Sequence, residues 1–302
     1  MVGSAICREL QARGYHNHFG RDISECNLTQ QALVDELFAE EKPEIVIVAA
    51  ARVGGINANN IYRSQFIYEN LMIEANIINA AHVYGVEKLI FLGSSCVYPK
   101  MAPQPLKEEY MLTGYLESTN EPYAIAKIAG IKLCQTYYRQ YGDNFYSVMP
   151  TNMYGPFDNY NLETSHVVPA LIRKFHEAKA SGAGFVTLWG TGTPYRELMY
   201  VEDLADALHF MIENVNADDL YKDGYSHINI GTGKDLSIAD LAATVARVVG
   251  FEGKVEYDPN KPDGTPKKLL DVSRMTAFGW KYKTELEDGI RLAYQWFLEN
   301  YK

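Results

Sequence analysis

Tyr123 and Lys127 stand four residues apart in the segment YAIAK, at the start of a predicted helix that Pro122 opens. Residues four apart lie on one face of a helix, so the phenol and the ammonium would be neighbours. Because a positive charge favours the phenolate, we expect the pKa of Tyr123 to fall from about 10 toward neutrality. Such a tyrosine can exchange a proton with an alcohol oxygen. The spacing alone is weak, since a surface tyrosine and lysine on an amphipathic helix would look the same.

A second polar cluster follows a buried apolar run about 30 residues upstream, in FLGSSCVYP (91–99). In a doubly wound sheet, ligands bind at the carboxyl ends of the strands. Ser94, or Ser95, could therefore donate a hydrogen bond to a reacting oxygen, while Lys127 reaches a nicotinamide ribose. A serine, a tyrosine and a lysine at this spacing, each behind the expected element, form a specific pattern.

The elements that must position these residues alternate in βαβ order through the first half of the chain. We predict helices over 4–13, 30–41, 66–84 and 122–141, and strands over 44–51, 86–92 and 145–150. This alternation predicts an α/β fold with a Rossmann-type doubly wound parallel sheet. The stretch 99–121, rich in proline and polar residues, is expected to be a functional or mobile loop.

The second half has shorter predicted strands and longer loops. We predict helices over 167–180, 202–215, 238–249 and 286–300, and strands over 186–189, 227–230 and 255–257. This pattern favours a smaller α/β substrate-binding domain over 157–302, after a larger domain over 1–156. Segments near 198–231 are expected to return to the main sheet.

Seven segments, spread over nearly the whole chain, carry a resemblance to a known family. They are AAARVGGINANN (49–60), FLGSSCVYPK (91–100), NEPYAIAKIAGIKLC (120–134), SVMPTNMYGP (147–156), SHVVPALIRKFHEA (165–178), WGTGTPYRELMYVEDLADA (189–207) and KPDGTPKKLLDVSR (261–274). With them the chain resembles the extended short-chain dehydrogenase/reductases, and most closely those that act on GDP-4-keto-6-deoxy-D-mannose. The resemblance implies a dinucleotide-binding domain over 1–156 and an NADPH-dependent 3,5-epimerisation and 4-keto reduction that yields GDP-L-fucose.

Epimerisation beside a keto group needs a base on one face of the sugar and an acid on the other. A thiol titrates near enough to neutrality to be the base, and Cys96 lies two residues beyond Ser94. The imidazole of His166 could be the opposing acid. The family assigns these roles to the matching residues; the alternatives are a small buried cysteine and a histidine that caps a helix.

The resemblance also implies binding residues. The cofactor is expected against Leu92, Gly93, Ser94, Ser95, Lys127, Pro150, Thr151, Asn152, Met153 and His166. The GDP-sugar is expected against Lys174, Trp189, Arg196 and Asp263. Lysine and arginine suit diphosphate oxygens, although Lys174 could instead be part of a solvated helix face and Trp189 could be core packing.

The cofactor is expected to be NADP, because Arg21 in HFGRDISECNL can accommodate a 2′-phosphate; the neighbouring Asp22 would suit NAD instead. The glycine fingerprint departs from the family pattern, which has an apolar strand and a GxxGxxG turn. MVGSAI matches only the last glycine, Gly3. We expect a truncated or mis-started form of a normal enzyme rather than a degraded paralogue.

Composition restricts the other classes of function. The net charge of −10 argues against non-specific nucleic-acid binding, and the longest apolar run, 45–51, is far too short to cross a membrane. Four cysteines without CxxC spacing indicate reduced thiols in a cytoplasmic protein and no metal site. We also expect a homodimer, because relatives pair the helices over 66–84 and 122–141 into a four-helix bundle.

Two other readings remain. A nucleotide-sugar 4-epimerase or 4,6-dehydratase would share Tyr123 and Lys127, but such dehydratases tend to carry an acidic residue beside the strand-end serine, where this chain has Ser-Ser-Cys. A non-catalytic dinucleotide-binding paralogue would have lost catalytic residues, and none that can be checked is lost.

Overall fold

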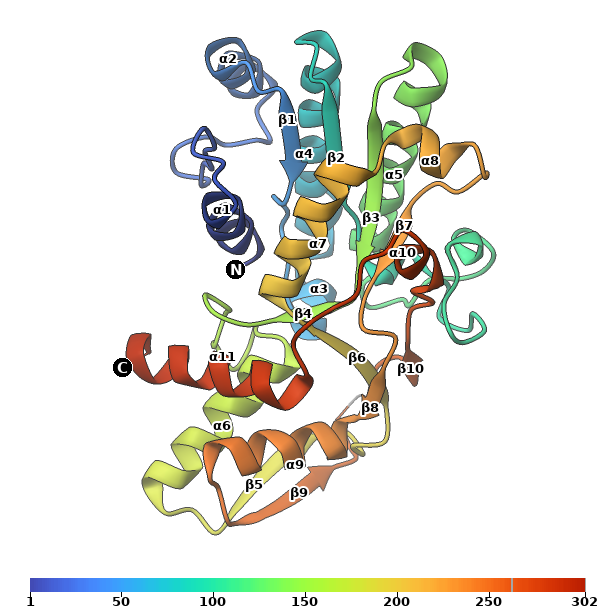
Figure 1. Cartoon of the computed structure of the whole chain (residues 1–302). Coiled ribbons are helices and arrows are strands. Elements are labelled where there is room, and N and C mark those ends of the chain that lie inside the picture. The colour runs from blue at the N-terminus through green and yellow to red at the C-terminus, as the bar shows by residue number, and fades with distance from the viewer. Residues whose placement is uncertain (262, 302) are drawn as a thin grey trace.

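A four-stranded parallel sheet forms the centre of the larger lobe, in the order β1-β2-β3-β7 (Figure 1). The computed structural model describes residues 1–261 and 263–301; Pro262, within the 261–274 segment, and Lys302 lie outside the described residues. The strands are β1 (Ile45–Val48), β2 (Lys88–Leu92), β3 (Phe145–Pro150) and β7 (Ile228–Ile230). The two central strands are apolar and buried, as a sheet covered on both faces requires. The predicted Rossmann-type fold is confirmed.

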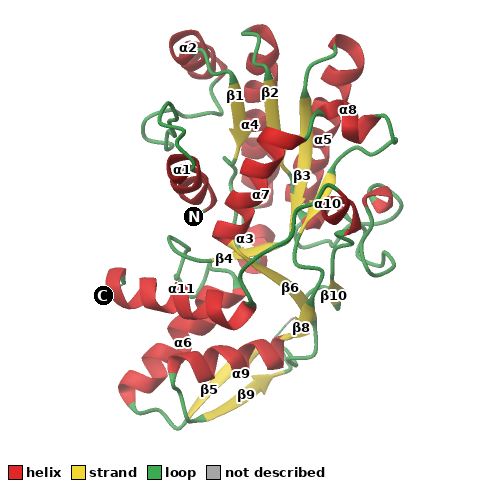
Figure 2. Cartoon of the chain, in the orientation of Figure 1, coloured by secondary structure: helices red, strands yellow, loops and turns green. Residues whose placement is uncertain are grey.

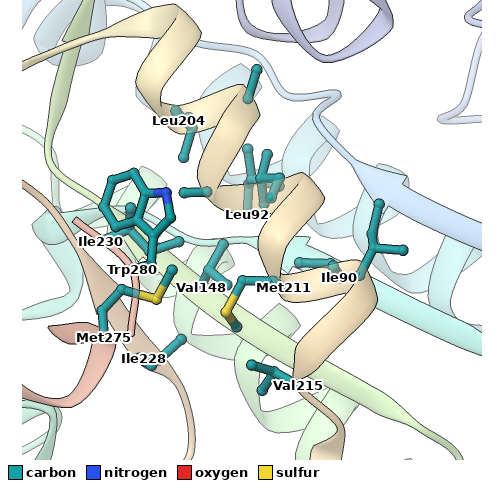
Figure 3. Close-up of a cluster of buried hydrophobic side chains, with 14 of the residues drawn as sticks. Ile90, Leu92, Val148, Leu204, Met211, Val215, Ile228, Ile230, Met275 and Trp280 are labelled. Carbon is teal, nitrogen blue, oxygen red and sulfur yellow. The ribbon is translucent and has the colours of Figure 1, made fainter. Parts of the chain in front are cut away.

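Helices cover both faces of this sheet. On one face lie α4 (Arg63–Val83) and α5 (Glu121–Tyr141), which pack along each other, with α2 (Gln31–Glu41) against α4. On the other face α7 (Val201–Asn214) packs against α1 (Val2–Ala12). Figure 3 shows Leu204 and Met211 of α7 over the sheet, with Val215 just after the helix. The other labelled residues of this core are Ile90, Leu92, Val148, Ile228, Ile230, Met275 and Trp280.

The smaller lobe has its own core. Helices α6 (Val167–Ser181), α9 (Ile238–Val249) and α11 (Leu286–Asn300) pack with the parallel pair β5 (Phe185–Trp189) and β9 (Lys254–Asp258). Between the lobes runs a small mixed sheet, in which β6 (Tyr195–Tyr200) pairs with β4 (Asn152–Tyr154), β8 (Asp235–Ser237) and β10 (Lys267–Lys268) (Figure 2).

Every predicted helix and strand is present, with ends shifted by a few residues. The first predicted strand is the most shortened, because Ala49 donates to the carbonyl of Ile47 in a turn that leaves the sheet. Elements not predicted are β4, β6, β8, β10, α3 (Ile56–Ile61), α8 (Ala217–Tyr221), α10 (Ser273–Ala277) and two short 3₁₀ turns, Ser95–Val97 and Glu108–Tyr110.

Residues 198–231 divide between the two sheets. α7 and β7 belong to the main sheet, where β7 pairs with β3, whereas β6 pairs with β4. The 99–121 stretch is held in place, since Leu106 bridges to Leu270 and its amide donates to the carbonyl of Leu269 at 2.7 Å. Within residues 1–261 and 263–301, no helix is long and apolar enough to span a bilayer.

Candidate active site

A cavity of about 510 Å³ lies where the carboxyl ends of β2 and β3 face the smaller lobe. Fifteen of the predicted site residues line it together. They are Leu92, Gly93, Ser94, Cys96, Tyr123, Lys127, Pro150, Thr151, Asn152, Met153, His166, Lys174, Trp189, Arg196 and Asp263. Residues that the sequence separates by up to 171 positions therefore share one space, as the ends of parallel strands predict.

The end of β2 is shaped by Gly93 and Ser94. A Cβ on Gly93, the residue after β2, would lie 2.5 Å from Sδ of Met149, so a larger residue here would require the Met149 side chain to move. Ser94 then caps a 3₁₀ turn, and its hydroxyl accepts the amide of Cys96 at 3.4 Å. In this turn the side chains of Ser94 and Cys96 line the cavity, whereas Ser95 lines a separate, smaller hollow. Of the two serines left open by the sequence, Ser94 is the one at the cavity.

Tyr123 and Lys127 face the cavity from the first turns of α5, and Ser94 lines the same cavity. The ammonium of Lys127 lies 5.9 Å from the centre of the Tyr123 ring and 2.9 Å from the carboxylate of Glu74. Burial raises the pKa of Tyr123 above its ordinary value, and the charges of Cys96 and Glu74 raise it further. The expectation that this pKa falls toward neutrality was wrong, because it ignored desolvation and the carboxylate that pairs with Lys127.

The sulfur of Cys96 has two polar neighbours. The side-chain amide of Asn120 donates to Sγ at 3.1 Å, and the ammonium of Lys268 donates to it at 3.5 Å. Asn120 occupies the N-cap position of α5, but within the described chain its side chain caps no backbone amide. A cation and an amide donor beside a thiol stabilise its thiolate, which is the form that acts as a base.

His166 lies at the N-cap position of α6, and in the described residues its ring makes no cap hydrogen bond. Burial lowers the pKa of His166 below its ordinary value, and the positive charge of Lys268 lowers it further. Its position depends on a close backbone contact: the amide of Gly55 donates to the carbonyl of Thr164 at 3.1 Å, and a Cβ on Gly55 would lie 2.8 Å from the carbonyl oxygen of Ser165.

Basic and aromatic side chains gather at the smaller-lobe end of the cavity. Lys174 lies 5.9 Å and Lys261 lies 5.3 Å from the ring of Trp189, which is 54% exposed. Arg196 is half-buried and donates to the carbonyl of Tyr195 at 2.7 Å. Here a planar aromatic surface and three cations are available to an anionic ligand with a flat ring.

Asp263, which lines the cavity, also makes contacts that hold a turn in place. Its two carboxylate oxygens accept the amide and hydroxyl of Thr191 at 2.7 and 2.8 Å. The turn at Gly190, with a φ of +81°, leaves no room for a Cβ beside this carboxylate. Asp263 therefore fixes the turn that follows Trp189, and its backbone carbonyl is 3.4 Å from the guanidinium of Arg196.

Three predicted residues do not line the cavity in the described structure: Gly3, Arg21 and Ser95. Gly3 lies in the first turn of α1, with open space where a Cβ would point. Arg21 pairs with Glu41 and lies 5.1 Å from the ring of Phe19. Ser95 is buried behind the strand end.

Sequence reasoning missed Glu74, Asn120 as a partner of Cys96, Lys261 and Lys268. Glu74 gave one usable signal, since it lies between the apolar residues Ile73 and Ala75 in the predicted 66–84 helix. Lys268 lies in a matched segment, but no spacing rule connects it with Cys96, 172 residues away.

Comparisons with known proteins agree on the family. A sequence model of the NAD dependent epimerase/dehydratase family matches residues 1–231. The chain is 54% identical to the GDP-L-fucose synthase of Escherichia coli K12, over 99% of this chain and 94% of that protein. A GDP-mannoheptose C4 reductase from Campylobacter jejuni with NADP bound superposes with a TM-score of 0.91 at 40% identity, over 98% and 95% of the two chains. A GDP-L-fucose synthetase from Naegleria fowleri bound to NADP gives 0.88 at 27% identity, over 99% and 91%.

Proposed function

The chain belongs to the NAD dependent epimerase/dehydratase family, and on that basis we propose that it converts GDP-4-keto-6-deoxy-D-mannose to GDP-L-fucose with NADPH. The observation that carries the proposal is the shared cavity of two chemical units. Ser94, Tyr123 and Lys127 form a reducing unit, and Cys96 and His166 form an acid–base pair beside it. The names of the similar proteins, a GDP-L-fucose synthase among them, support the same assignment.

The reducing unit fits an NADP cofactor at the strand ends. Gly93, with no side chain, and the residues 150–153 after β3 form one wall, and Lys127 projects beside Tyr123. When bound, NADPH would supply the hydride. Tyr123 donates its phenolic proton to the oxygen of the former keto group, and Ser94 hydrogen-bonds that oxygen as its charge develops. Because burial keeps the phenol protonated, Tyr123 enters the reaction as an acid.

The acid–base pair carries out the epimerisation. Cys96, as a thiolate beside Lys268 and Asn120, removes a proton from the carbon next to the keto group. The negative charge moves to the keto oxygen, where the hydroxyls of Ser94 and Tyr123 stabilise it. His166 returns a proton to that carbon from the other face. Cys96 then releases the proton that it took, and His166 regains one, by exchange with solvent. The same sequence at the second carbon completes the 3,5-epimerisation.

The GDP portion occupies the smaller-lobe end of the cavity in this proposal. Arg196 and Lys174 bind the diphosphate, and the base lies on the exposed face of Trp189. Asp263 acts through the turn that it fixes at Thr191. The chain thus works as a dinucleotide-binding domain over 1–156 and a substrate domain over 157–302. Arg21 and Gly3 would approach only the adenosine end of the cofactor.

The active form in this proposal is a homodimer. Apolar side chains on the outer faces of α4 and α5 remain exposed, among them Tyr68 at 62% and Ile125 at 42%. Pairing α4 and α5 of two copies would cover them in a four-helix bundle. A single-chain mass by light scattering at micromolar concentration would contradict it. The cysteines Cys7, Cys26, Cys96 and Cys134 are all free thiols, which fits a reducing cytoplasmic location.

Two measurements on the purified chain test the function. Incubation with GDP-4-keto-6-deoxy-D-mannose in heavy water reports epimerisation as deuterium entering at two sugar carbons, and NADPH absorbance reports reduction. We expect both in the wild type. Tyr123→Phe should lose the reduction and keep deuterium entry, whereas Cys96→Ser should lose deuterium entry. Reduction without any deuterium entry in the wild type would instead make the chain a C4 reductase, like its Campylobacter relative.

A further inference from the structure

Glu74, in the middle of α4, is a buried carboxylate that the steps above do not use. Its side chain is 1% exposed, and its partner Lys127 is 2% exposed. A carboxylate oxygen of Glu74 lies 2.9 Å from Nζ of Lys127. Because a buried charge is costly unless it is paired, the two charges depend on each other in this position.

The fold leaves a place for this carboxylate between α4 and α5. Gly130 lies one turn after Lys127 on α5, and a Cβ there would lie 2.9 Å from Oε2 of Glu74 and 2.7 Å from Cε1 of Phe91. Burial raises the pKa of the Glu74 carboxyl, and the charge of Lys127 and the nearby amide of Gly130 oppose this rise. On the other side, the ring of Phe91 lies 4.5 Å from Nζ of Lys127. The ammonium is therefore fixed between a carboxylate, an aromatic ring and the phenol of Tyr123.

The pair changes the electric field at Tyr123. A lone ammonium near the ring would favour the phenolate, but a carboxylate at 2.9 Å cancels much of its field at longer range. Burial is the main cause of the raised pKa of Tyr123, and the charge of Glu74 adds to it. The titratable and charged side chains that surround the phenol or share its cavity are Glu74, Cys96, Glu117, Lys127, Glu163, His166, Lys174, Arg196, Asp263 and Lys268.

We propose that Glu74 is a positioning residue of the reductive step, which holds Lys127 in place and cancels enough of its positive field to keep Tyr123 a neutral proton donor. The assignment rests on the proposed function, because only reduction of a keto group needs the phenol as an acid. With Glu74 neutralised, Lys127 would favour the phenolate, which cannot protonate the new alkoxide. The site would then be suited to alcohol oxidation.

The test reads the ionisation of Tyr123 directly. The chain is labelled with tyrosine carrying ¹³C at the ring carbon bonded to oxygen, and the Tyr123 signal is assigned by its loss in Tyr123→Phe. Titrations compare the wild type with Glu74→Gln, which keeps the shape and removes the charge, and Glu74→Asp, which keeps the charge. We expect the Tyr123 midpoint to fall by one pH unit or more in Glu74→Gln and to stay nearer the wild-type value in Glu74→Asp.

The reduction rate should follow the same order. In Glu74→Gln the pH at which kcat for reduction falls on the alkaline side should decrease together with the Tyr123 midpoint. A purely structural role of Glu74 would not shift this pH dependence. Equal Tyr123 midpoints in the wild type and Glu74→Gln, or a Tyr123 phenolate in the wild type at pH 8, would overturn the proposal. Because this signal needs no substrate, a failure to turn over the proposed sugar is distinguishable from a failure of the role of Glu74.

A second variant covers the case in which Glu74→Gln does not fold. The double change Glu74→Gln, Lys127→Met removes both charges and leaves no unpaired ion. If the charges of Glu74 and Lys127 nearly cancel at the phenol, removing both should leave the Tyr123 midpoint within about half a pH unit of the wild-type value. A shift larger than one unit in the double variant would overturn the cancellation on which the proposal depends.

Discussion

Gly130→Ala should destabilise the protein and slow its reduction step. The added Cβ would lie 2.7 Å from Cε1 of Phe91 and 2.9 Å from Oε2 of Glu74, where real Cβ atoms are not found. Phe91 is fully buried in β2, which pairs with strands on both sides, so its ring has little freedom to retreat. The helices α4 and α5 must then separate, or the Glu74–Lys127 pair must shift.

The size of the effect is the difference between two opposing terms. Extra volume in a packed core costs about 1–3 kcal/mol, and the contacts here favour the upper end of that range. Replacing glycine by alanine inside a helix returns up to about 1 kcal/mol. We therefore expect a net loss of about 2 kcal/mol in the free energy of unfolding, or a fall in Tm of about 3 °C for a chain of 302 residues. A displacement of Lys127 near 1 Å would lower kcat for reduction by about 10- to 100-fold.

The assay is urea unfolding followed by tryptophan fluorescence, together with NADPH oxidation on the keto sugar. Gly3→Ala is a matched control, since Gly3 is also helical and its Cβ would meet open space within the described structure; it should be neutral or slightly stabilising. Phe91→Leu combined with Gly130→Ala should be less unstable than the two single losses added together. If Gly130→Ala is as stable as Gly3→Ala, the close approach of α4 and α5 does not set the position of the ion pair.

Three further outcomes are expected. Arg196→Lys should raise KM for the GDP-sugar about 10-fold and change kcat little, because one ammonium replaces a two-pronged guanidinium; a fall in kcat at constant KM would contradict the binding role. Lys268→Met should lower deuterium entry at least about 10-fold while reduction of the already epimerised keto sugar continues, because the Cys96 thiolate loses the cation 3.5 Å away; equal losses would be evidence against it. Burial lowers the pKa of His227 to about 3, so below its unfolded pKa of about 6.5 the unfolded chain binds a proton that the folded chain does not. As the pH falls below about 6.5, the free energy of unfolding of the wild type should therefore decrease by up to about 1.4 kcal/mol per pH unit relative to His227→Gln. If the free energies of the two proteins change in parallel with pH, this linkage is disproved.

The main sheet and the residues at its strand ends were predictable because their signals are local. Apolar runs with turn residues between them gave β2 and β3, and in a parallel sheet their carboxyl ends must meet. Ser94, Tyr123 and Lys127 follow those ends directly, so their convergence in one cavity could be expected. Strand-end reasoning could not place His166 in this cavity, because its segment lies outside the main sheet. Only the family resemblance predicted it there.

The rest depends on contacts between distant parts of the chain. β4 has three residues and pairs Asn152 with Leu198, and no periodicity can be read from so short a strand. The pKa of Tyr123 was predicted in the wrong direction because local spacing does not show that the phenol is buried, nor that α4 places the carboxylate of Glu74 beside Lys127. Local spacing shows which side chains are neighbours on one helix, but not what a second helix places between them.

The packing of α1 against α7 has a consequence for how the protein is made. Arg8 and Glu202, which form an ion pair between these helices, are 194 residues apart, and Ala5 and Ile6 share a core with α7. At about 5–20 residues per second, a ribosome needs roughly 10–40 seconds to synthesise the intervening chain. Throughout that interval the apolar face of α1 lacks α7, the helix that it packs against, and β3 lacks its neighbour β7. The nascent chain is therefore exposed to aggregation until α7 emerges. In chains stalled at successive lengths, chaperone binding should fall sharply once both α7 and β7 have left the exit tunnel.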